Sequence, residues 1–527
     1  MSLIQALQNP ALYDHPVEKF EVIETHISLV LLTGEYVYKI KKPVNFGFLD
    51  FSSLEKRQHY CNEELRLNRR LAPELYLEVV SITGSEAQPQ LNGPGEAIEY
   101  AVKMRQFPQS AQLDRMLASG QLDPSIIDRL ADKVAQFHLT IKSVETGSPY
   151  GDAEHLKLPM MENFTQIREA IDETDIKPIL DALEQWTRRR LLALAPGIAE
   201  RKADGFVREC HGDMHLRNIA FWQNEIVVFD CIEFNPNLYW IDVISEIAFL
   251  IMDLEDRDQE ALAQRFLNRY LEITGDYEGL RLLMFYKVYR AMVRAKVDAL
   301  RLKQEQAGSS EYEQTFSEFH QYLQLAARYI QPAHPILLIN YGLSGSGKSV
   351  TTRQLAEALP AIQLRSDIER KRLFKVPPFG VASVDREILY SDEAHDRTYT
   401  RLVELAGKLL KAGYTVIVDA ANLHRNRRQQ FVELAESIQV PYSILAFEAE
   451  EGILRQRVEQ RARTKEDVSD ATASVLQQQL ANHEPISAEE QDYSIVIDTG
   501  GKIDFDSIVK QIRNKAGMDC DKKELKT

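Results

Sequence analysis

Residues 342–349 read Gly-Leu-Ser-Gly-Ser-Gly-Lys-Ser, and this octapeptide constrains the fold more than any other stretch of the chain. It fits the G-x-x-x-x-G-K-[ST] pattern at every position, follows the apolar run 336–341 and opens a helical sequence. Small residues let backbone N–H groups curl around a phosphate, and a helix N-terminus adds positive potential there. The pattern therefore predicts a phosphate-binding loop (P-loop) that joins a strand to a helix.

The side chains of this loop predict which nucleotide it takes. A lysine at the seventh position can bridge the β- and γ-phosphates of ATP, and a serine at the eighth can ligate Mg²⁺. The positions that we expect to contact ATP are Gly342, Ser344, Gly345, Ser346, Gly347, Lys348 and Ser349, with Ser349 as a metal ligand.

Strands and helices alternate around the loop, as in a parallel sheet with helices on both faces. Polar side chains follow two of the expected strands, at the edge where substrates bind in such sheets. Asp367 could take the proton of an attacking hydroxyl, and Arg370 could hold an anionic group on the acceptor. Asp419 ends another strand and is expected to steady Mg²⁺. The expected strands are 336–341, 361–364, 414–419, 442–447 and 493–498.

A basic helical segment, 454–463, follows the fourth of these strands. Arg457 and Arg461 are four residues apart and so share one helix face. In P-loop kinases such a segment closes on the phosphates, and its arginines neutralise the charge of the transferring group.

Together these residues resemble the small P-loop kinases, which include the polynucleotide-kinase kinase domain, zeta toxins and gluconate or shikimate kinases. Asp367 with Arg370, the segment 419–428 and the segment 469–479 are most similar to the bacterial group called AAA_33. The resemblance covers about 335–510. It implies phosphoryl transfer and leaves the acceptor open, because members phosphorylate very different hydroxyls.

A second motif lies in the first half, where residues 210–218 read Cys-His-Gly-Asp-Met-His-Leu-Arg-Asn. Asp213 and Asn218 have the spacing of a kinase catalytic loop, in which the Asp orients the hydroxyl and the Asn binds Mg²⁺. Asp230 ends a later apolar strand, as a metal-binding Asp would. The sequence from 230 to 233 is Asp-Cys-Ile-Glu, so the Phe-Gly of protein kinases is absent.

This arrangement resembles the aminoglycoside phosphotransferases and related small-molecule kinases, which share the protein-kinase fold. The resemblance implies an ATP-contacting lysine at Lys39 and its ion-pair partner at Glu64. Lys41 and Lys42 are close rivals for the first role and Glu63 for the second. Strand alternation places Lys39 and Lys41 on the same face, so periodicity does not choose between them.

The first hairpin has one glycine, Gly34, where protein kinases have the G-x-G-x-x-G of their phosphate-covering loop. Aminoglycoside phosphotransferases manage without that pattern, so this departure favours them. Residues 102–107 are expected to form the hinge between the two lobes. On the resemblance, Asp242 and Glu246 belong to a helix that supports the catalytic loop, and His211 is expected to brace that loop through hydrogen bonds.

Length and charge set the broader limits. The chain has 527 residues and a formal net charge of −16, so bulk attraction to nucleic acid or to an anionic membrane is not expected. Four scattered cysteines without a C-x-x-C pair, and the lack of a signal sequence or an 18-residue apolar run, predict a reduced cytoplasmic protein without membrane segments. The sequence is silent on oligomeric state.

The sequence thus predicts a fusion of two kinase domains, α+β and then α/β. The first is a bilobal kinase-like domain over 1–330, with its small lobe over about 1–105 and its large lobe over about 106–330. The second is a P-loop domain over 335–515, and 516–527 is expected to be a disordered tail. The whole chain resembles a bacterial family with this domain order.

We expect each half to bind ATP and Mg²⁺ and to phosphorylate a hydroxyl of a small molecule. Two other functions remain open. One is 5′-hydroxyl polynucleotide kinase activity in the second half, and the other is an ATP-gated switch with one or both sites idle.

Overall fold

The computed structural model describes residues 2–47, 49–171, 174–377, 386–464 and 472–517, without the side chains of 386–387 and 461–464. The described chain forms two units. The first unit comprises Met1–Arg257 and Leu282–Ile330, and the second comprises Asp258–Arg281 and Gln331–Thr527. The segment 258–281 therefore differs from the predicted division, which placed it with the first half.

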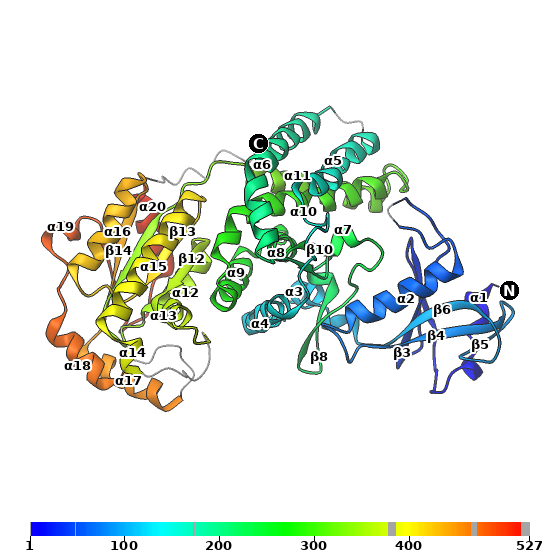
Figure 1. The fold of residues 1–527 in the computed structure, drawn as a ribbon, viewed down its shortest axis with the longest axis horizontal. Helices are drawn as coiled ribbons and strands as arrows, with labels where there is room; N and C mark the ends of the chain where they lie inside the picture. The colour runs from blue at the N-terminus through cyan, green and yellow to red at the C-terminus, as the bar shows by residue number, and fades with distance from the viewer. Residues whose placement is uncertain (1, 48, 172–173, 378–385, 465–471, 518–527) are drawn as a thin grey trace. The chain divides into compact units, whose positions relative to one another are not determined.

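The first unit begins with an antiparallel sheet of six strands in the order β1-β2-β3-β6-β4-β5. Helix α2 (Leu54–Asn68) lies against β6 and β4 (Figure 1). Ser53 caps α2 by accepting a hydrogen bond from the Lys56 amide. The chain turns twice between 76 and 105 and forms three strands there. The strands are β1 (Glu21–Glu24), β2 (Ser28–Leu32), β3 (Tyr36–Lys41), β4 (Tyr76–Ser85), β5 (Gln88–Leu91) and β6 (Ala97–Arg105).

The rest of the first unit is mainly helical, with two short antiparallel strand pairs, β7 with β10 and β8 with β9. These pairs carry the predicted catalytic loop and metal-binding segment, and α8 is buried along nearly its whole length beneath them. The elements are α3 (Leu113–Ala118), α4 (Pro124–Thr140), α5 (Ala153–Ala170), α6 (Lys177–Ala203), β7 (Val207–Glu209), β8 (Ile219–Trp222), β9 (Glu225–Val228), α7 (Pro236–Tyr239), β10 (Trp240–Asp242), α8 (Val243–Asp256), α10 (Leu280–Leu302) and α11 (Ser310–Tyr329).

The second unit is built on a parallel sheet of five strands in the order β12-β13-β11-β14-β15. All five strands lie within one residue of their predicted ends. Every position of β11 and β12 is buried, because helices cover both faces of the sheet (Figure 1). The strands are β11 (Leu337–Tyr341), β12 (Ala361–Arg365), β13 (Thr415–Asp419), β14 (Tyr442–Glu448) and β15 (Ser494–Asp498).

The helices of the second unit follow the strands in turn. Leucines and isoleucines of the sheet pack with α12 and α20 in one apolar cluster, while α15 and α16 contact β13 and β11. The helices are α12 (Lys348–Ala358), α13 (Ser366–Leu373), α14 (Arg386–Leu389), α15 (Asp392–Lys411), α16 (Arg425–Ser437), α17 (Glu451–Thr464), α18 (Ala473–Asn482), α19 (Ala488–Gln491) and α20 (Phe505–Lys515). Residues 518–527 of the predicted tail lie outside the described residues.

Helix α9 (Glu260–Thr274) comes from the first half of the sequence but belongs to the second unit. It packs against α12 and lies along β12, the edge strand of the sheet. Asn268 completes the strand's hydrogen bonding: its Nδ2 donates to the Ala361 carbonyl at 3.0 Å, and its Oδ1 accepts from the Gln363 amide at 2.9 Å. Gln264 also donates to the Ala361 carbonyl, at 2.8 Å. The edge of the sheet is therefore covered by side chains rather than left open.

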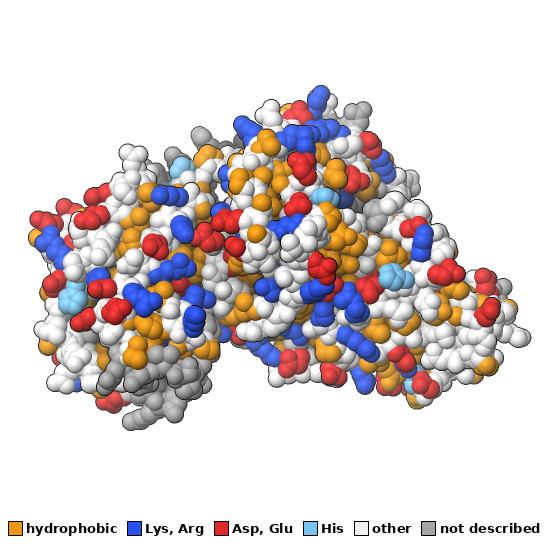
Figure 2. Space-filling view, viewed as in Figure 1, with side chains coloured by type: hydrophobic (Ala, Val, Ile, Leu, Met, Phe, Trp, Pro, Cys, Tyr) orange, Lys and Arg blue, Asp and Glu red, His pale blue; other side chains and the backbone are white. Residues whose placement is uncertain are grey.

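The described helices include none with the length and apolar character that a membrane crossing needs. On the face shown in Figure 2, basic and acidic side chains are interspersed over the surface of each unit.

Candidate active sites

The predicted ATP-contacting residues of the first unit meet in one buried network of charges. Lys39 Nζ lies 2.8 Å from Glu64 Oε1 and 2.5 Å from Asp230 Oδ1. Lys41 Nζ lies 2.7 Å from the other Glu64 oxygen and also pairs with Glu233. Both lysines thus reach Glu64, as strand alternation predicts, but only Lys39 contacts the expected metal-binding Asp230.

The surroundings of these groups explain their charge states. Burial would raise the pKa of Glu64, but Lys39 and Lys41 lower it to about 2, so it is ionised. Burial raises the pKa of Glu233 despite the opposing charge of Lys41. The rival Glu63 lies elsewhere and pairs with Arg66 at the surface.

Asp213 and Asn218 lie together in the loop between β7 and β8. Asn218 Nδ2 donates to the Asp213 carbonyl at 3.0 Å and to its Oδ2 at 2.9 Å. Burial would raise the pKa of Asp213, but His215, whose Nε2 lies 3.3 Å from Oδ2, lowers it to well below the usual range. The carboxylate is therefore ionised and can accept a hydrogen bond from a hydroxyl.

Hydrogen bonds from several elements hold this loop in place. His211 Nε2 lies 2.9 Å from the Phe229 carbonyl, and its Nδ1 lies 3.3 Å from the Asp213 amide. Because Nε2 must donate and Nδ1 accept, the imidazole is neutral, in agreement with the lowering of its pKa by burial. Arg290 of α10 donates to the Gly212 carbonyl at 3.1 Å. The expected bracing role of His211 is confirmed.

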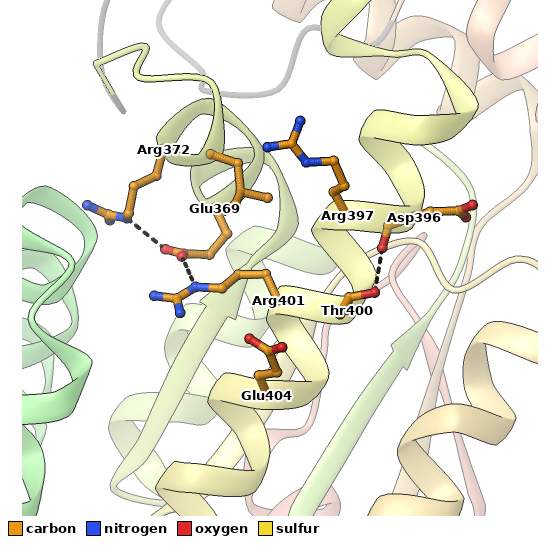
Figure 3. Close-up of a pocket in the computed structure, with 8 residues that line it drawn as sticks. Glu369, Arg372, Asp396, Arg397, Thr400, Arg401 and Glu404 are labelled. Atoms are coloured by element: carbon orange, nitrogen blue, oxygen red, sulfur yellow. Dashed lines mark hydrogen bonds and ion pairs between the residues drawn. The ribbon is translucent and has the colours of Figure 1, made fainter.

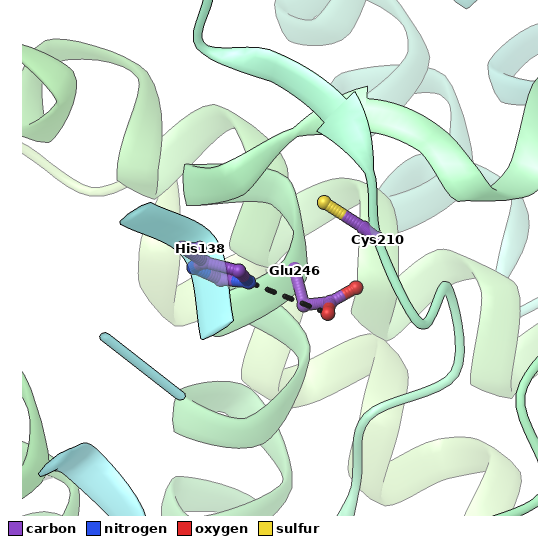
Figure 4. A group of neighbouring side chains, drawn as sticks. All are labelled: His138, Cys210 and Glu246. Carbon is purple, nitrogen blue, oxygen red and sulfur yellow. Dashed lines mark hydrogen bonds and ion pairs between the residues drawn. The ribbon is translucent and has the colours of Figure 1, made fainter. Parts of the chain in front are cut away.

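Glu246 forms a second brace with His138, beside Cys210 (Figure 4). The possible ligand atoms of these buried residues all lie within 4.8 Å of one another, which is compatible with a metal ion. Yet the Glu246 carboxylate accepts the amides of His211 and Gly212 at 2.8–2.9 Å. Burial also raises the pKa of the Cys210 thiol far above its ordinary value, so it remains protonated. We interpret this cluster as a support of the catalytic loop.

In the second unit, the P-loop curls between β11 and α12 as its sequence predicts. Gly345 and Gly347 have φ of +83° and +79°, which side-chain-bearing residues rarely adopt. A Cβ at Gly342 would lie 2.7 Å from the Phe447 carbonyl. Lys348 Nζ donates to the carbonyls of Gly342 and Leu343 at 2.7 and 2.8 Å. The loop backbone is thus shaped for close approach of a phosphate.

The loop opens into a cavity of about 760 Å³. Ser349, Asp367, Arg370 and Asp419 line it, so the side chains predicted for metal, base and acceptor share one space. Arg370 Nη1 lies 2.9 Å from Asp367 Oδ1. The cavity thus contains both the P-loop and the Asp367–Arg370 pair.

Asp419 is buried at the end of β13 and held by neighbouring side chains. Gln363 Nε2 donates to its Oδ2 at 2.9 Å, and Asn340 Nδ2 to its Oδ1 at 3.3 Å. Arg365 Nε lies 3.8 Å from Asp419 Oδ2, and its Nη1 lies 3.3 Å from Glu272 of α9. Helix α9 therefore contributes to the surroundings of this carboxylate.

The two arginines of the basic helix α17 differ in what the structure describes. Arg457 Nη1 donates to Thr499 Oγ1 at 3.0 Å and to the Gly345 carbonyl at 3.3 Å, at the rim of the P-loop. The side chain of Arg461 lies outside the described residues.

A second cavity, of about 530 Å³, lies between α13 and α15 (Figure 3). Arg372 and Arg401 point toward Glu369 from two sides, at 3.1 and 3.6 Å. Their charges are thus paired within the protein, and none of the predicted site residues lies there.

Comparison with known proteins finds two domains, although the match to the first extends over the segment 258–281 that the structure groups with the second unit. Residues 32–283 match the model of the phosphotransferase enzyme family (APH), and residues 337–486 match the AAA domain AAA_33. The chain is 30% identical over 412 residues to uncharacterized protein Rv2004c of Mycobacterium tuberculosis (strain ATCC 25618 / H37Rv), which is 77% of this chain and 79% of that protein. Uncharacterized protein Mb2027c of Mycobacterium bovis gives the same values.

The chain belongs to this family of APH–AAA_33 fusion proteins. It is a phosphotransferase, and its two halves have the folds of a protein-kinase-like kinase and of a P-loop kinase.

Solved structures of kinases resemble each half. Amicoumacin kinase hAmiN, in complex with AMP-PNP, Ca²⁺ and Ami, is 13% identical and covers 61% of this chain and 93% of its own, with a TM-score of 0.40. A gluconokinase from Sinorhizobium meliloti 1021 is 20% identical and covers 35% of this chain and 92% of its own, with a TM-score of 0.24.

Several residues of the APH and AAA_33 sites were not assigned from the sequence. Glu233 follows the expected metal-binding segment, but its pairing with Lys41 across the fold has no sequence pattern. Arg290 lies 78 residues after Gly212, and no sequence pattern points to the hydrogen bond between them. In the AAA_33 site, His395 lines the cavity although it belongs to no recognised motif. Arg427 also lines it and lies in the segment 419–428 that carries the resemblance, but the sequence assigned no role to it.

Proposed function

We propose that the protein is a bifunctional ATP-dependent kinase, in which each unit binds ATP with Mg²⁺ and phosphorylates a hydroxyl of a small molecule. One observation carries the proposal. In each unit, residues that are far apart in the sequence and have the types that phosphoryl transfer needs lie together at one site.

In the APH unit, the described residues fit ATP and Mg²⁺. Asp230 has φ of +62° and keeps half of its side chain exposed, so its carboxylate can ligate a metal. Asn218 donates its amide nitrogen to Asp213, and its amide oxygen remains a suitable metal ligand. Lys39, held by Glu64, would contact the ATP phosphates.

Bound ATP and Mg²⁺ would supply the phosphoryl group and the charge that stabilises its transfer. Asp213 would orient the acceptor hydroxyl and receive its proton as the new O–P bond forms and the bond to the β-phosphate oxygen breaks. Glu246, His211 and Arg290 would keep Asp213 in position, because each of them bonds to the catalytic loop or its immediate neighbours.

In the AAA_33 unit, the P-loop amides and Lys348 would hold the β- and γ-phosphates, while Ser349 and Asp419 would hold Mg²⁺. Lys348 would exchange its contacts with loop carbonyls for the phosphates. Asp367 would accept the proton of the acceptor hydroxyl, and Arg370 would bind the acceptor. Arg457, and Arg461 by its place on the same helix, would neutralise the transferring group.

The test is a metabolite-extract screen with γ-labelled ATP. Wild type, Asp213→Asn and Lys348→Ala should give different sets of labelled products, since each variant disables one unit. The product set of each single variant should lack the products of the unit that the variant disables. The double variant should give no labelled product. A double variant that labels the same products as the wild type would contradict the proposal.

Two outcomes would favour the functions left open by the sequence. Labelling of 5′-hydroxyl oligonucleotides that Lys348→Ala abolishes would indicate a polynucleotide kinase. ADP formation without any labelled product in any extract would indicate an ATP-gated switch.

A further inference from the structure

One end of the AAA_33 cavity, around the Asp367–Arg370 pair, is lined by basic and aromatic side chains from three helices. Arg370 belongs to α13, His395 and Tyr399 to α15, and Arg427 to α16. Tyr390 lies between α14 and α15 and lines the same end.

Arg370 is buried although its hydrogen bonding is incomplete. Its side chain is only 6% exposed, and its guanidinium lies 4.8 Å from the centre of the Tyr390 ring. One terminal nitrogen donates to Asp367, but the buried Nε has no hydrogen-bond partner. A buried donor without a partner is costly, so this guanidinium is suited to a ligand that supplies an acceptor.

Arg427 of α16 is arranged in a similar way. Its guanidinium lies 4.8 Å from the centre of the Tyr399 ring, and it pairs with Asp396, which is largely exposed. Tyr399 is fixed in turn, because its hydroxyl accepts the Asn422 amide at 3.3 Å. Two arginines are thus oriented by aromatic rings at one end of one cavity.

His395 lies within the field of both arginines. Burial lowers the pKa of His395, and the charges of Arg370 and Arg427 lower it further, so the imidazole is neutral. A neutral imidazole can donate one hydrogen bond without adding to the repulsion between the two guanidinium groups.

We propose that the acceptor of the AAA_33 unit carries a phosphate-type oxyanion, which Arg370 and Arg427 hold between them, with His395 beside it. This inference rests on the proposed function and names the chemical class of its acceptor. A carboxylate is satisfied by one guanidinium through two hydrogen bonds, whereas donors from three helices suit a group with three or more oxygens.

The position of the oxyanion also limits where the acceptor hydroxyl can lie. Asp367 pairs with Arg370, so the hydroxyl that Asp367 serves must lie next to the bound oxyanion. The acceptor is therefore a compact molecule whose hydroxyl and oxyanion are a few bonds apart.

The test uses the full chain and calorimetry with inorganic phosphate as the probe. Phosphate is titrated with and without saturating AMP-PNP and Mg²⁺, since the analogue occupies the γ-phosphate position. We expect wild type to bind phosphate with the analogue present, and Arg427→Gln and Arg370→Gln each to weaken this binding at least tenfold. Acetate, the carboxylate probe, should bind at least tenfold more weakly than phosphate.

Arg425→Gln is the matched control, because Arg425 begins the same helix but is exposed, pairs with Glu489 and does not line the cavity. It should bind phosphate like the wild type. The inference is overturned if phosphate does not bind in the presence of the analogue, if Arg427→Gln binds it unchanged, or if acetate binds equally well.

The proposed function itself has a separate readout. AMP-PNP should bind at two sites per chain in the wild type and at one in Lys348→Ala. If Lys348→Ala leaves this stoichiometry unchanged, nucleotide binding by the AAA_33 unit fails. If it falls to one while phosphate does not bind, only the oxyanion inference fails.

Discussion

Lys39 and Lys41 share Glu64 but differ in their second partner, and this difference predicts different roles. Lys39→Met should lower phosphoryl transfer by the APH unit by at least about 10²-fold, because the cation that we propose to contact the ATP phosphates is lost. Its effect on stability should be smaller, since Lys41 still neutralises Glu64. Turnover and thermal unfolding of Lys39→Met and of Lys41→Met measure the two effects.

Lys41→Met should instead have its larger effect on stability and its smaller effect on phosphoryl transfer. It leaves Glu233 buried without its cation, and breaking a buried pair in this way costs about 3–5 kcal/mol of unfolding free energy. The double variant Lys41→Met/Glu233→Gln should recover much of that loss, because both charges are then removed. Equal losses of stability in Lys39→Met and Lys41→Met would show that the two lysines are equivalent.

Asp298 predicts a pH dependence of stability in the first unit. It is 2% exposed, and burial raises its pKa to about 6 although Arg294 opposes the shift. A carboxyl whose pKa is higher in the folded state stabilises the fold below its unfolded pKa, near 4, and this stabilisation is lost as the pH rises through 6. The free energy of unfolding of Asp298→Asn, relative to that of the wild type, should therefore increase by about 1–3 kcal/mol as the pH rises from 4.5 to 7.5.

Urea unfolding of both proteins at these two pH values measures the gain. The same difference in free energy at both values would mean that Asp298 does not titrate in this range.

At the scale of single residues, the sequence predicts most sharply those that belong to a motif of fixed spacing. Asp213, Asn218 and the P-loop positions have fixed spacing because one short segment must present several atoms to one ligand. Lys39 and Lys41 could not be separated, because both point to the same face of β3. Glu233, Arg427 and His395 act across the fold, where spacing along the chain carries no information.

At the scale of single elements, the edge strand β12 depends on α9. Asn268→Ala removes the acceptor of the buried Gln363 amide and should destabilise the second unit by about 1–3 kcal/mol. Glu260→Gln on the same helix is exposed and should have little effect. Denaturant midpoints of the two variants compare them, and equal midpoints would contradict the dependence of β12 on α9.

The periodicity of apolar residues predicts that α9 is a helix, but it does not predict which part of the fold this helix packs against. Its buried side chains, such as Phe266 and Tyr270, indicate only that one face is covered. An amphipathic pattern does not tell which part of the chain covers it. The predicted boundary lies at 331–335, where the chain contains Pro332 and Pro335, and this local signal does not mark a segment that joins the second unit earlier in the sequence.

At the scale of the whole molecule, the second unit is incomplete when the chain is cut at its predicted boundary. A fragment 335–527 lacks α9, so β12 becomes an open edge and the apolar surface of α12 is exposed. We expect this fragment to aggregate in size-exclusion chromatography. A synthetic peptide of residues 258–281 added during refolding should increase the monomer yield, and a scrambled peptide should not. A fragment 335–527 that stays monomeric and binds ATP with the affinity of the full-length wild type would contradict this expectation.

The position of α9 also affects how the protein can fold while it is being made. Its last residue, Thr274, is synthesised about 90 residues before β12, which at roughly 5–20 residues per second is a delay of about 5–20 s. During that time the apolar face of α9 has left the ribosome without the sheet that it later covers. Translation that stops after α9 but before β12 therefore releases a chain in which the apolar face of α9 is exposed and prone to aggregate. Such truncated chains should depend on chaperones or be degraded, even when the first unit is complete.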